Sequence, residues 1–222
     1  MIRSILVFVV LLVSQLSLAS GFGLKPDWKE VGNGGNVVHC GKGYRMLDAW
    51  EAENGFKLPE STVNFPETIF DDSFDAAFAL ANTLVDSLRY REFSRWQSYK
   101  EALATFKQEA EFLEHVNLLP VNDQGLTVIP INCSLEQLVV QRRDIAADNI
   151  RYVFSGQIWA HLTVSDKAAA IVHEVIYRRA LNADPEILTS EDVRAFNGLL
   201  ISNRVETMSN FEYYLMAEKV PY

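Results

Sequence analysis

Residues 165–181 read SDKAAAIVHEVIYRRAL, and they predict a long helix in the last third of the chain. Ser165 is a favourable N-cap, so the helix is expected to run from Asp166 to about Leu181 and to end before Pro185. His173 shares one face of this helix with small and aliphatic side chains. An apolar face at helical spacing predicts that the helix packs against the core of the protein.

The pair His173-Glu174 is the feature of this stretch that could carry chemistry. The metal-binding helix of a zinc peptidase begins with such a pair. Its two histidines, four residues apart, bind zinc, and the glutamate polarises the metal-bound water. Here Tyr177 follows His173 at that spacing, so the helix alone does not form the chelate. The alternative interpretation is therefore a metal-dependent hydrolase with a rearranged site, in which His173 binds zinc and Glu174 is the catalytic general base.

The main interpretation of the motif is structural. A single histidine on an apolar helix face is usually a core residue with a hydrogen-bond partner, and Tyr177 and Asn197 are available to complete a buried polar cluster with it. Glu174 and Arg178 are four residues apart with the acid first, which favours a surface ion pair. Tyr177, Arg178 and Asn197 are then the candidate binding residues. No cofactor is expected, and zinc belongs to the alternative only.

A zinc site would need ligands from other parts of the chain. The remaining candidates are the imidazoles of His39, His115 and His161, with Glu191 or Asp192 on the next expected helix. Nothing in their spacing indicates that any of them converges on His173.

Upstream of this helix, the chain alternates between β-prone and helical patterns. Residues 37–40 and 44–47 flank a Gly-rich turn and predict a hairpin. Further β-prone runs are found at 126–129, 135–141 and 150–154. Apolar residues at helical spacing predict an antiparallel helical pair inserted between these strands, at about 71–117.

Downstream of it, Glu191 to about Ile201 is expected to be helical, and Ser209 opens a capping box before a final short helix. No linker or repeat divides residues 20–222. The chain is therefore expected to form one α+β domain, with a small, mostly antiparallel sheet of about five strands, the inserted helical pair, and C-terminal helices packed on the sheet.

The first nineteen residues are typical of a secretory signal peptide. Arg3 precedes an apolar run at 5–13, and small residues at Ser17 and Ala19 favour cleavage after Ala19. A membrane-spanning helix is the weaker interpretation, because the uninterrupted apolar run is shorter than the roughly 20 residues that a span needs. The protein is expected to be periplasmic or secreted, without membrane insertion after cleavage.

The two cysteines, Cys40 and Cys133, are an even pair in a chain that is expected to enter an oxidising compartment. A disulfide is the favoured interpretation, and two buried free thiols are the alternative. Neither cysteine has a second one at the spacing of a metal site.

The composition excludes some classes of partner. The 222 residues include 20 basic and 29 acidic side chains, for a net charge of -9. A field of this sign repels phosphate, so nucleic acid is not an expected partner.

Several segments together resemble a family of uncharacterised exported proteins from predatory and related environmental bacteria. The matching segments are GNGGNVVHC (32–40), MLDAWEA (46–52), IPINCSLEQ (129–137), IW (158–159), HEVIYR (173–178), VRAFN (193–197) and LL (199–200). The resemblance implies a bacterial origin, and it implies that the His-Glu-x-x-Tyr-Arg form is the family's own pattern. It also implies that Cys40 and Cys133 belong together as a pair. It implies no reaction, substrate or cofactor. The expected function is a non-catalytic interaction or structural module that contacts a protein or an envelope ligand.

Overall fold

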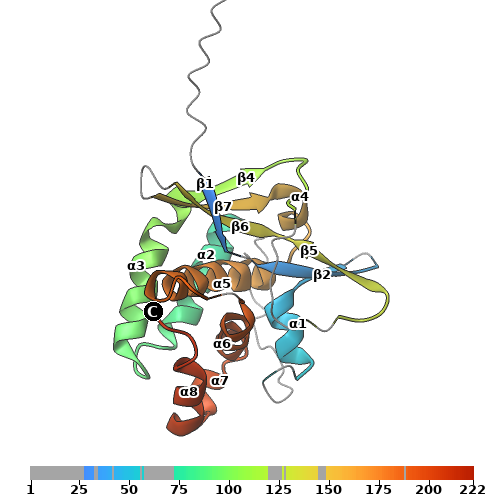
Figure 1. Ribbon diagram of the computed structural model, residues 1–222. Helices are drawn as coiled ribbons and strands as arrows, with labels where there is room; N and C mark the ends of the chain where they lie inside the picture. Colours follow the sequence, from blue (N-terminus) through green and yellow to red (C-terminus); the bar gives the residue numbers. More distant parts are fainter. Residues whose placement is uncertain are drawn as a thin grey trace, which may run out of the picture.

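The computed structural model in Figure 1 describes residues 28–32, 35–41, 43–55, 57, 73–119, 127, 129–144, 149–187 and 189–222. The strands are β1 (Trp28–Gly32), β2 (Asn36–Cys40), β3 (Gly43–Met46), β4 (Ala110–Leu113), β5 (Cys133–Gln137), β6 (Val139–Asp144) and β7 (Asn149–Ser155). The helices are α1 (Leu47–Glu53), α2 (Phe74–Asp86), α3 (Phe93–Glu109), α4 (Gly156–Trp159), α5 (Val164–Ala183), α6 (Glu191–Ile201), α7 (Arg204–Thr207) and α8 (Asn210–Ala217). The expected signal peptide lies outside the described residues, as do residues 126 and 128 of the expected strand at 126–129; residues 127 and 129 are described and belong to no strand.

The strands form two sheets, one with the order β1-β6-β7-β4 and one with the order β3-β2-β5. All pairings are antiparallel except that of β4 with β7. This is the expected α+β class with mostly antiparallel pairing. The expectation of about five strands in one sheet differs from the structure, because the β-prone run at 135–141 is two strands. Leu138 separates β5 from β6, and each strand belongs to a different sheet.

Gly35 lies where the two sheets part. Its carbonyl oxygen accepts hydrogen bonds from the backbone N–H groups of Leu138 and Val139, at 3.1 and 3.3 Å. A Cβ atom on Gly35 would lie 2.6 Å from Cε of Met46, so a side chain here would meet the core. Of the Gly-rich run at 32–35, this glycine has a structural role, and residues 33–34 lie outside the described part of the chain.

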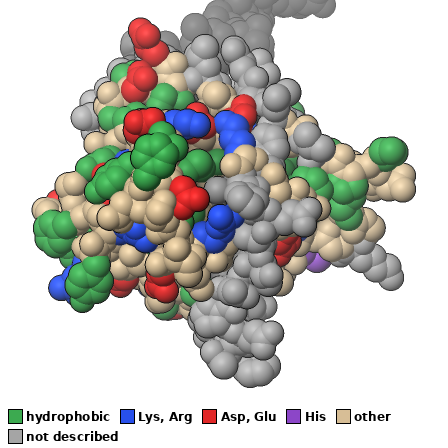
Figure 2. Space-filling view, turned by 90° about the horizontal axis from the view of Figure 1, so that it is seen from below, with side chains coloured by type: hydrophobic (Ala, Val, Ile, Leu, Met, Phe, Trp, Pro, Cys, Tyr) green, Lys and Arg blue, Asp and Glu red, His purple; other side chains and the backbone are tan. Residues whose placement is uncertain are grey.

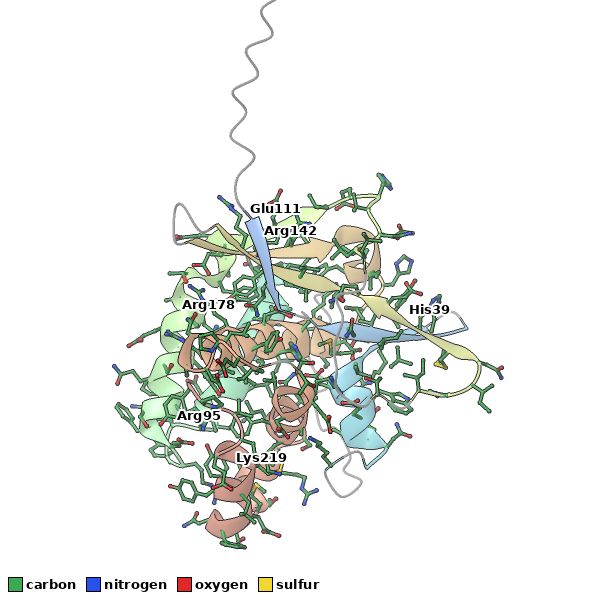
Figure 3. All side chains as sticks on the ribbon, in the orientation of Figure 1. His39, Arg95, Glu111, Arg142, Arg178 and Lys219 are labelled. Carbon is green, nitrogen blue, oxygen red and sulfur yellow. A yellow bond between two sulfur atoms is a disulfide. The ribbon has the colours of Figure 1, made fainter. Side chains whose placement is uncertain are left out.

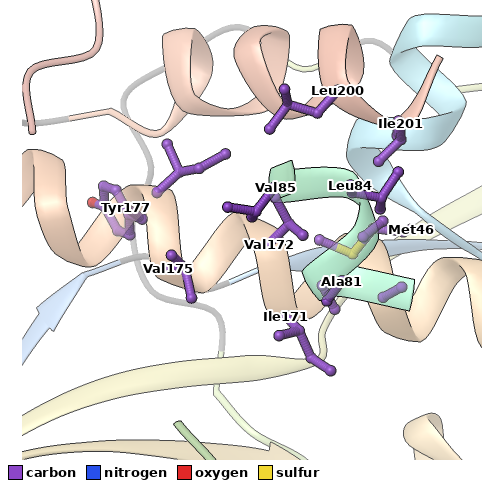
Figure 4. Packing of buried hydrophobic residues seen from close by; sticks show 14 of the residues in the cluster. Met46, Ala81, Leu84, Val85, Ile171, Val172, Val175, Tyr177, Leu200 and Ile201 are labelled. Carbon is purple, nitrogen blue, oxygen red and sulfur yellow. The ribbon is translucent and has the colours of Figure 1, made fainter. Parts of the chain in front are cut away.

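The helix α5 passes through the middle of the molecule, as Figure 1 shows. It contacts α2, α3 and α6, and it is buried along most of its 20 residues. In Figure 4, Val172 and Val175 of α5 lie among Leu84 and Val85 of α2 and Leu200 of α6. A helix that is buried on nearly all sides places its polar residues in the interior, which is the origin of the site described below.

The helix ends follow local capping signals, with one difference from expectation. The N-cap of α5 is Thr163, whose side chain accepts from the N–H of Asp166, and Ser165 is the second residue of the helix. The helix α6 has the expected bounds, and α8 begins with the expected capping box at Ser209. The N-cap residue of α6, Ser190, makes no side-chain capping bond, whereas Ser209 and Glu212 both make the capping bonds of α8.

The expected helical pair is present as α2 and α3. Lys107 near the end of α3 pairs with Asp75 at the start of α2, and Trp96 near the start of α3 donates to Asp86 at the end of α2. The two helices are therefore antiparallel. The expected extension of the second helix to about Leu113 is wrong, because Ala110–Leu113 forms β4 and pairs in parallel with β7.

The expected hairpin is β2 with β3, and Gly41 in its turn has a φ of +62°. Cys40 of β2 lies opposite Cys133 of β5, and the two cysteines form a disulfide. The favoured interpretation of the cysteines is thus confirmed. Among the described residues, no helix has the length and apolar character needed to cross a membrane.

Candidate functional site

Three helices bring polar side chains together beneath the surface. Nδ1 of His173 on α5 lies 2.8 Å from Oδ2 of Asp48 on α1, and the amide of Asn197 on α6 donates to the same oxygen at 2.7 Å. The Asn197 amide also donates to the carbonyl oxygen of Ala169 at 2.9 Å. His173 is 1% exposed, and Asp48 and Asn197 are fully buried. Asn197 thus lies in a buried polar cluster with His173, and Asp48 joins the two.

The imidazole of His173 is placed to carry a positive charge. Burial opposes protonation, but the attraction of the Asp48 carboxylate and the hydrogen bond to it outweigh that effect and raise the pKa of His173 above its ordinary 6.5. The neighbouring Glu174 raises the pKa further, whereas Arg194 lowers it. The contact with Asp48 therefore favours the protonated form of the His173 imidazole.

The Glu174 side chain is fully buried and bonded to the junction of the sheets. Oε1 accepts from the backbone N–H of Gly35 at 2.6 Å, and Oε2 accepts from the Gln141 amide at 2.8 Å. Burial raises the pKa of this carboxyl group, against the attraction of His173 and the two hydrogen bonds. The expectation of a surface ion pair between Glu174 and Arg178 is wrong, because the face of α5 that carries Glu174 is also buried in the core.

Arg178 instead donates to the carboxylate of Glu109 and, at 3.2 Å, to the hydroxyl of Tyr152. These contacts fix α5 to the end of α3 and to β7, and Figure 3 shows Arg178 on this side of the molecule. Tyr177 is 3% exposed, and its ring centroid lies 6.0 Å from that of His173. The three candidate binding residues are thus buried or half-buried, and each contacts other parts of the fold.

A second buried ion pair lies one turn along α1 from Asp48. Oε2 of Glu51 is 2.9 Å from Nε of Arg194 on α6, and both side chains are at most 2% exposed. Burial raises the pKa of Glu51 from 4.5 to about 7, although the nearby guanidinium of Arg194 acts in the opposite direction. The helix α1 therefore contributes two carboxylates to the interior.

The other suggested zinc ligands lie apart from His173. Nδ1 of His39 is 2.7 Å from Oε1 of Glu136, and its ring stacks on Tyr44 with a centroid distance of 4.2 Å. Figure 3 places His39 on the three-stranded sheet, well away from Arg178 on α5. Glu191 and Asp192 both pair with Lys57. In the described part of the chain, no group of three or more His, Cys, Asp or Glu side chains is arranged to hold a metal ion.

Comparison with protein-family models, with curated proteins and with solved structures found no match to this chain. The site is therefore interpreted from its own geometry. Asp48 and Glu51 are among the polar residues of the site that the sequence analysis did not single out. They lie on α1, whose N-cap residue Met46 makes no side-chain capping bond, so no capping signal indicates that a helix begins there.

Proposed function

We propose that this protein is an exported, non-catalytic binding or structural module in which the His173-Glu174 segment stabilises the fold. The observation that best supports this is the burial of both side chains together with their partners. A general base must reach the proton that it removes from a substrate or a water molecule. Both oxygens of Glu174 instead accept hydrogen bonds from Gly35 and Gln141.

The proposed location is the periplasm or the extracellular medium, after cleavage behind Ala19. The Cys40–Cys133 disulfide is compatible with an oxidising compartment. The partner is a protein or an envelope ligand, since a net charge of -9 disfavours nucleic acid. Intact-mass measurement of the exported protein tests this, with an N-terminus at Ser20 as the expected result and an uncleaved chain as the contrary one.

One observation supports the alternative, a metal-dependent hydrolase. Nδ1 of His173 bonds to a carboxylate, and Nε2 is buried without a hydrogen-bond partner among the described residues. Metal-binding histidines have this arrangement, with one nitrogen oriented by a carboxylate and the other directed to the ion. His173 would then be the ligand and Glu174 the base, but further ligands would have to come from outside the described residues.

The two functions predict different results for the purified protein. Elemental mass spectrometry after incubation with zinc should find far less than about one zinc per chain if the cluster is structural. His173→Ala should then lower the free energy of unfolding by about 1–3 kcal/mol, because the buried carboxylate of Asp48 loses its imidazole partner. Stoichiometric zinc, lost in His173→Ala, would favour the hydrolase. In that case Glu174→Gln should abolish turnover and leave zinc bound.

A further inference from the structure

A groove of about 1050 Å³ is lined by residues other than those of the His173 cluster. It lies between the second half of α2 and the segment that contains α7 and the start of α8. Its floor is apolar and is made by Leu80 and Leu84 of α2 and Val205 of α7, all of which are at most 4% exposed. The volume is at the upper end of the about 300–1,000 Å³ that is usual for ligand pockets. The groove therefore has room for an elongated ligand.

The walls of the groove are polar, and their charged side chains are Asp86, Arg91 and Glu206. The guanidinium of Arg91 donates to Oδ1 of Asn210 and to the carbonyl oxygens of Val205 and Met208, at 2.6, 2.6 and 3.0 Å. Because these acceptors already occupy it, Arg91 is a poor site for an anionic group. The carboxylate of Asp86 accepts from Trp96.

The carboxylates of the lining, Asp86 and Glu206, also disfavour an anion. Lys100 lies 3.2 Å from Asp86, whereas Glu206 is exposed on α7. These carboxylates accept hydrogen bonds, and the hydroxyls of Thr83 and Ser87 add further donors and acceptors to the lining. The groove thus suits a ligand whose hydroxyl groups both donate and accept hydrogen bonds.

Exposed aromatic rings flank the groove. Tyr90 in its lining is 94% exposed, and Phe211 is 73% exposed. Tyr90 precedes Arg91 and Phe211 follows Asn210, so the hydrogen bond between Arg91 and Asn210 holds the two ring-bearing segments side by side. Figure 2 views this end of the molecule and shows apolar side chains among charged ones on the surface. Exposed rings of this size on a monomer point to a contact with a ligand.

We propose that this groove binds a neutral oligosaccharide. The C–H face of a sugar ring packs on an exposed aromatic ring such as Tyr90, and sugar hydroxyls match the mixed donors and acceptors of Thr83, Ser87 and Asn210. The volume of the groove, about 1050 Å³, accommodates more than one sugar unit. The inference rests on the proposed function, because it names the ligand class of an exported binding module.

The test is an NMR titration of the isotope-labelled protein with cellohexaose, maltohexaose and chitohexaose. Saturable shift changes centred on Tyr90, Arg91 and Asn210 are expected for at least one of them, with a dissociation constant of about 0.1–1 mM. Preference for the N-acetylated chitohexaose indicates a glycan of the envelope type, and preference for either glucan indicates a storage or structural glucan. Tyr90→Ala should weaken binding by about tenfold, and Tyr90→Phe should retain most of it.

Phe93→Ala is the matched control. Its ring is 59% exposed, packs on Trp96 and lies outside the groove lining, so binding should be unchanged. The proposal is overturned if none of the three sugars gives a saturable shift at about 10 mM, a concentration that would reveal even weak complexes. It is also overturned if Tyr90→Ala binds as tightly as the unaltered protein. Mass spectrometry of the sugar after incubation distinguishes the two proposals. Cleavage of the sugar would contradict the non-catalytic function but not binding in the groove. Absence of binding would contradict the oligosaccharide site but not the non-catalytic function.

Discussion

Nδ1 of His173 lies 2.8 Å from Oδ2 of Asp48, although 125 residues separate them along the chain. The contact joins α5 to α1, and Asn197 extends it to α6. The pair is surrounded by protein, so neither charge is solvated by water, and each depends on the other for its stabilisation. Substitutions in this cluster therefore measure how much the buried polar side chains contribute to the free energy of unfolding.

Removal of one member of the pair should be costly. Asp48→Ala leaves His173 without its carboxylate and should lower the free energy of unfolding by about 3–5 kcal/mol, measured by urea denaturation. Asp75→Ala is the matched control, because Asp75 is 81% exposed and pairs with an exposed Lys107. It should cost at most about 1 kcal/mol. Equal losses in the two variants would contradict an energetic role for the buried pair.

Stability should fall as the pH rises, because the pKa values of Glu51, Glu174 and His173 are all raised in the folded protein. The pKa of Glu51 is about 4.5 in the unfolded chain and about 7 in the folded protein, because burial disfavours the charged form. The stabilisation from this group is fully present below pH 4.5 and is lost as the pH rises through about 7, a loss of about 3 kcal/mol. The raised pKa of His173 acts in the same direction, from its ordinary 6.5 upward.

Urea denaturation at a series of pH values measures this dependence. Glu51→Gln cannot ionise, so its stability should vary less between pH 5 and about pH 8 than that of the unaltered protein. The control Glu53→Gln alters an exposed carboxylate on the same helix that pairs with Arg45. It should keep the original slope, and parallel profiles for Glu51→Gln and the unaltered protein would count against the raised pKa.

Local signals in the sequence predicted α5, α6 and α8, but not the short helices α4 and α7. Ser209 and Glu212 form the capping box that their spacing predicts, and α6 begins at Glu191 as expected. Sequence reasoning failed where tertiary pairing decides the conformation. Residues 110–113 continue the helical spacing of α3, yet they form a strand because β7 offers an edge with which they pair.

The candidate site was predicted only in part, for a similar reason. The pattern around His173 predicts a buried histidine that needs a partner, and Asn197 was one of the residues suggested. Asp48 was not found, because sequence spacing carries no information about a contact between α1 and α5. Glu174 was expected on the surface, because an acid four residues before Arg178 favours an ion pair on an exposed helix face. Its burial depends on a tertiary contact, the hydrogen bond from the backbone N–H of Gly35.

Gly35→Ala should destabilise the junction of the two sheets. The new Cβ would lie 2.6 Å from Cε of Met46, a side chain that is fully buried, and 3.5 Å from Oε1 of Glu174. Because Met46 is enclosed by the core, the expected loss is about 1–3 kcal/mol in chemical denaturation. Gly156→Ala is a geometric control: its Cβ would lie 2.5 Å from Oε1 of Glu114, whose exposed side chain has room to move. A loss as large in Gly156→Ala would show that backbone effects, not core packing, dominate.

The disulfide should contribute much of the stability of the three-stranded sheet. Cys40 and Cys133 are paired residues of β2 and β5, with Cα atoms 4.5 Å apart and 93 residues between them in sequence. In the chain-entropy model a bond that closes a loop of this length restricts the unfolded chain and contributes about 4–5 kcal/mol. The double variant Cys40→Ser/Cys133→Ser should therefore unfold at a lower urea concentration, by that difference in free energy.

Ser134→Ala, next to Cys133 on the exposed part of β5, should change stability by no more than about 0.5 kcal/mol and serves as the control. Intact-mass analysis with and without reductant should show the unaltered protein two hydrogen masses lighter before reduction. If the protein purified without reductant carried free thiols, the bond would be absent under native conditions. If the double variant were as stable as the oxidised protein, the β2–β5 pairing would hold the sheet without it, because the hydrogen bonds and side-chain contacts between these strands would then suffice.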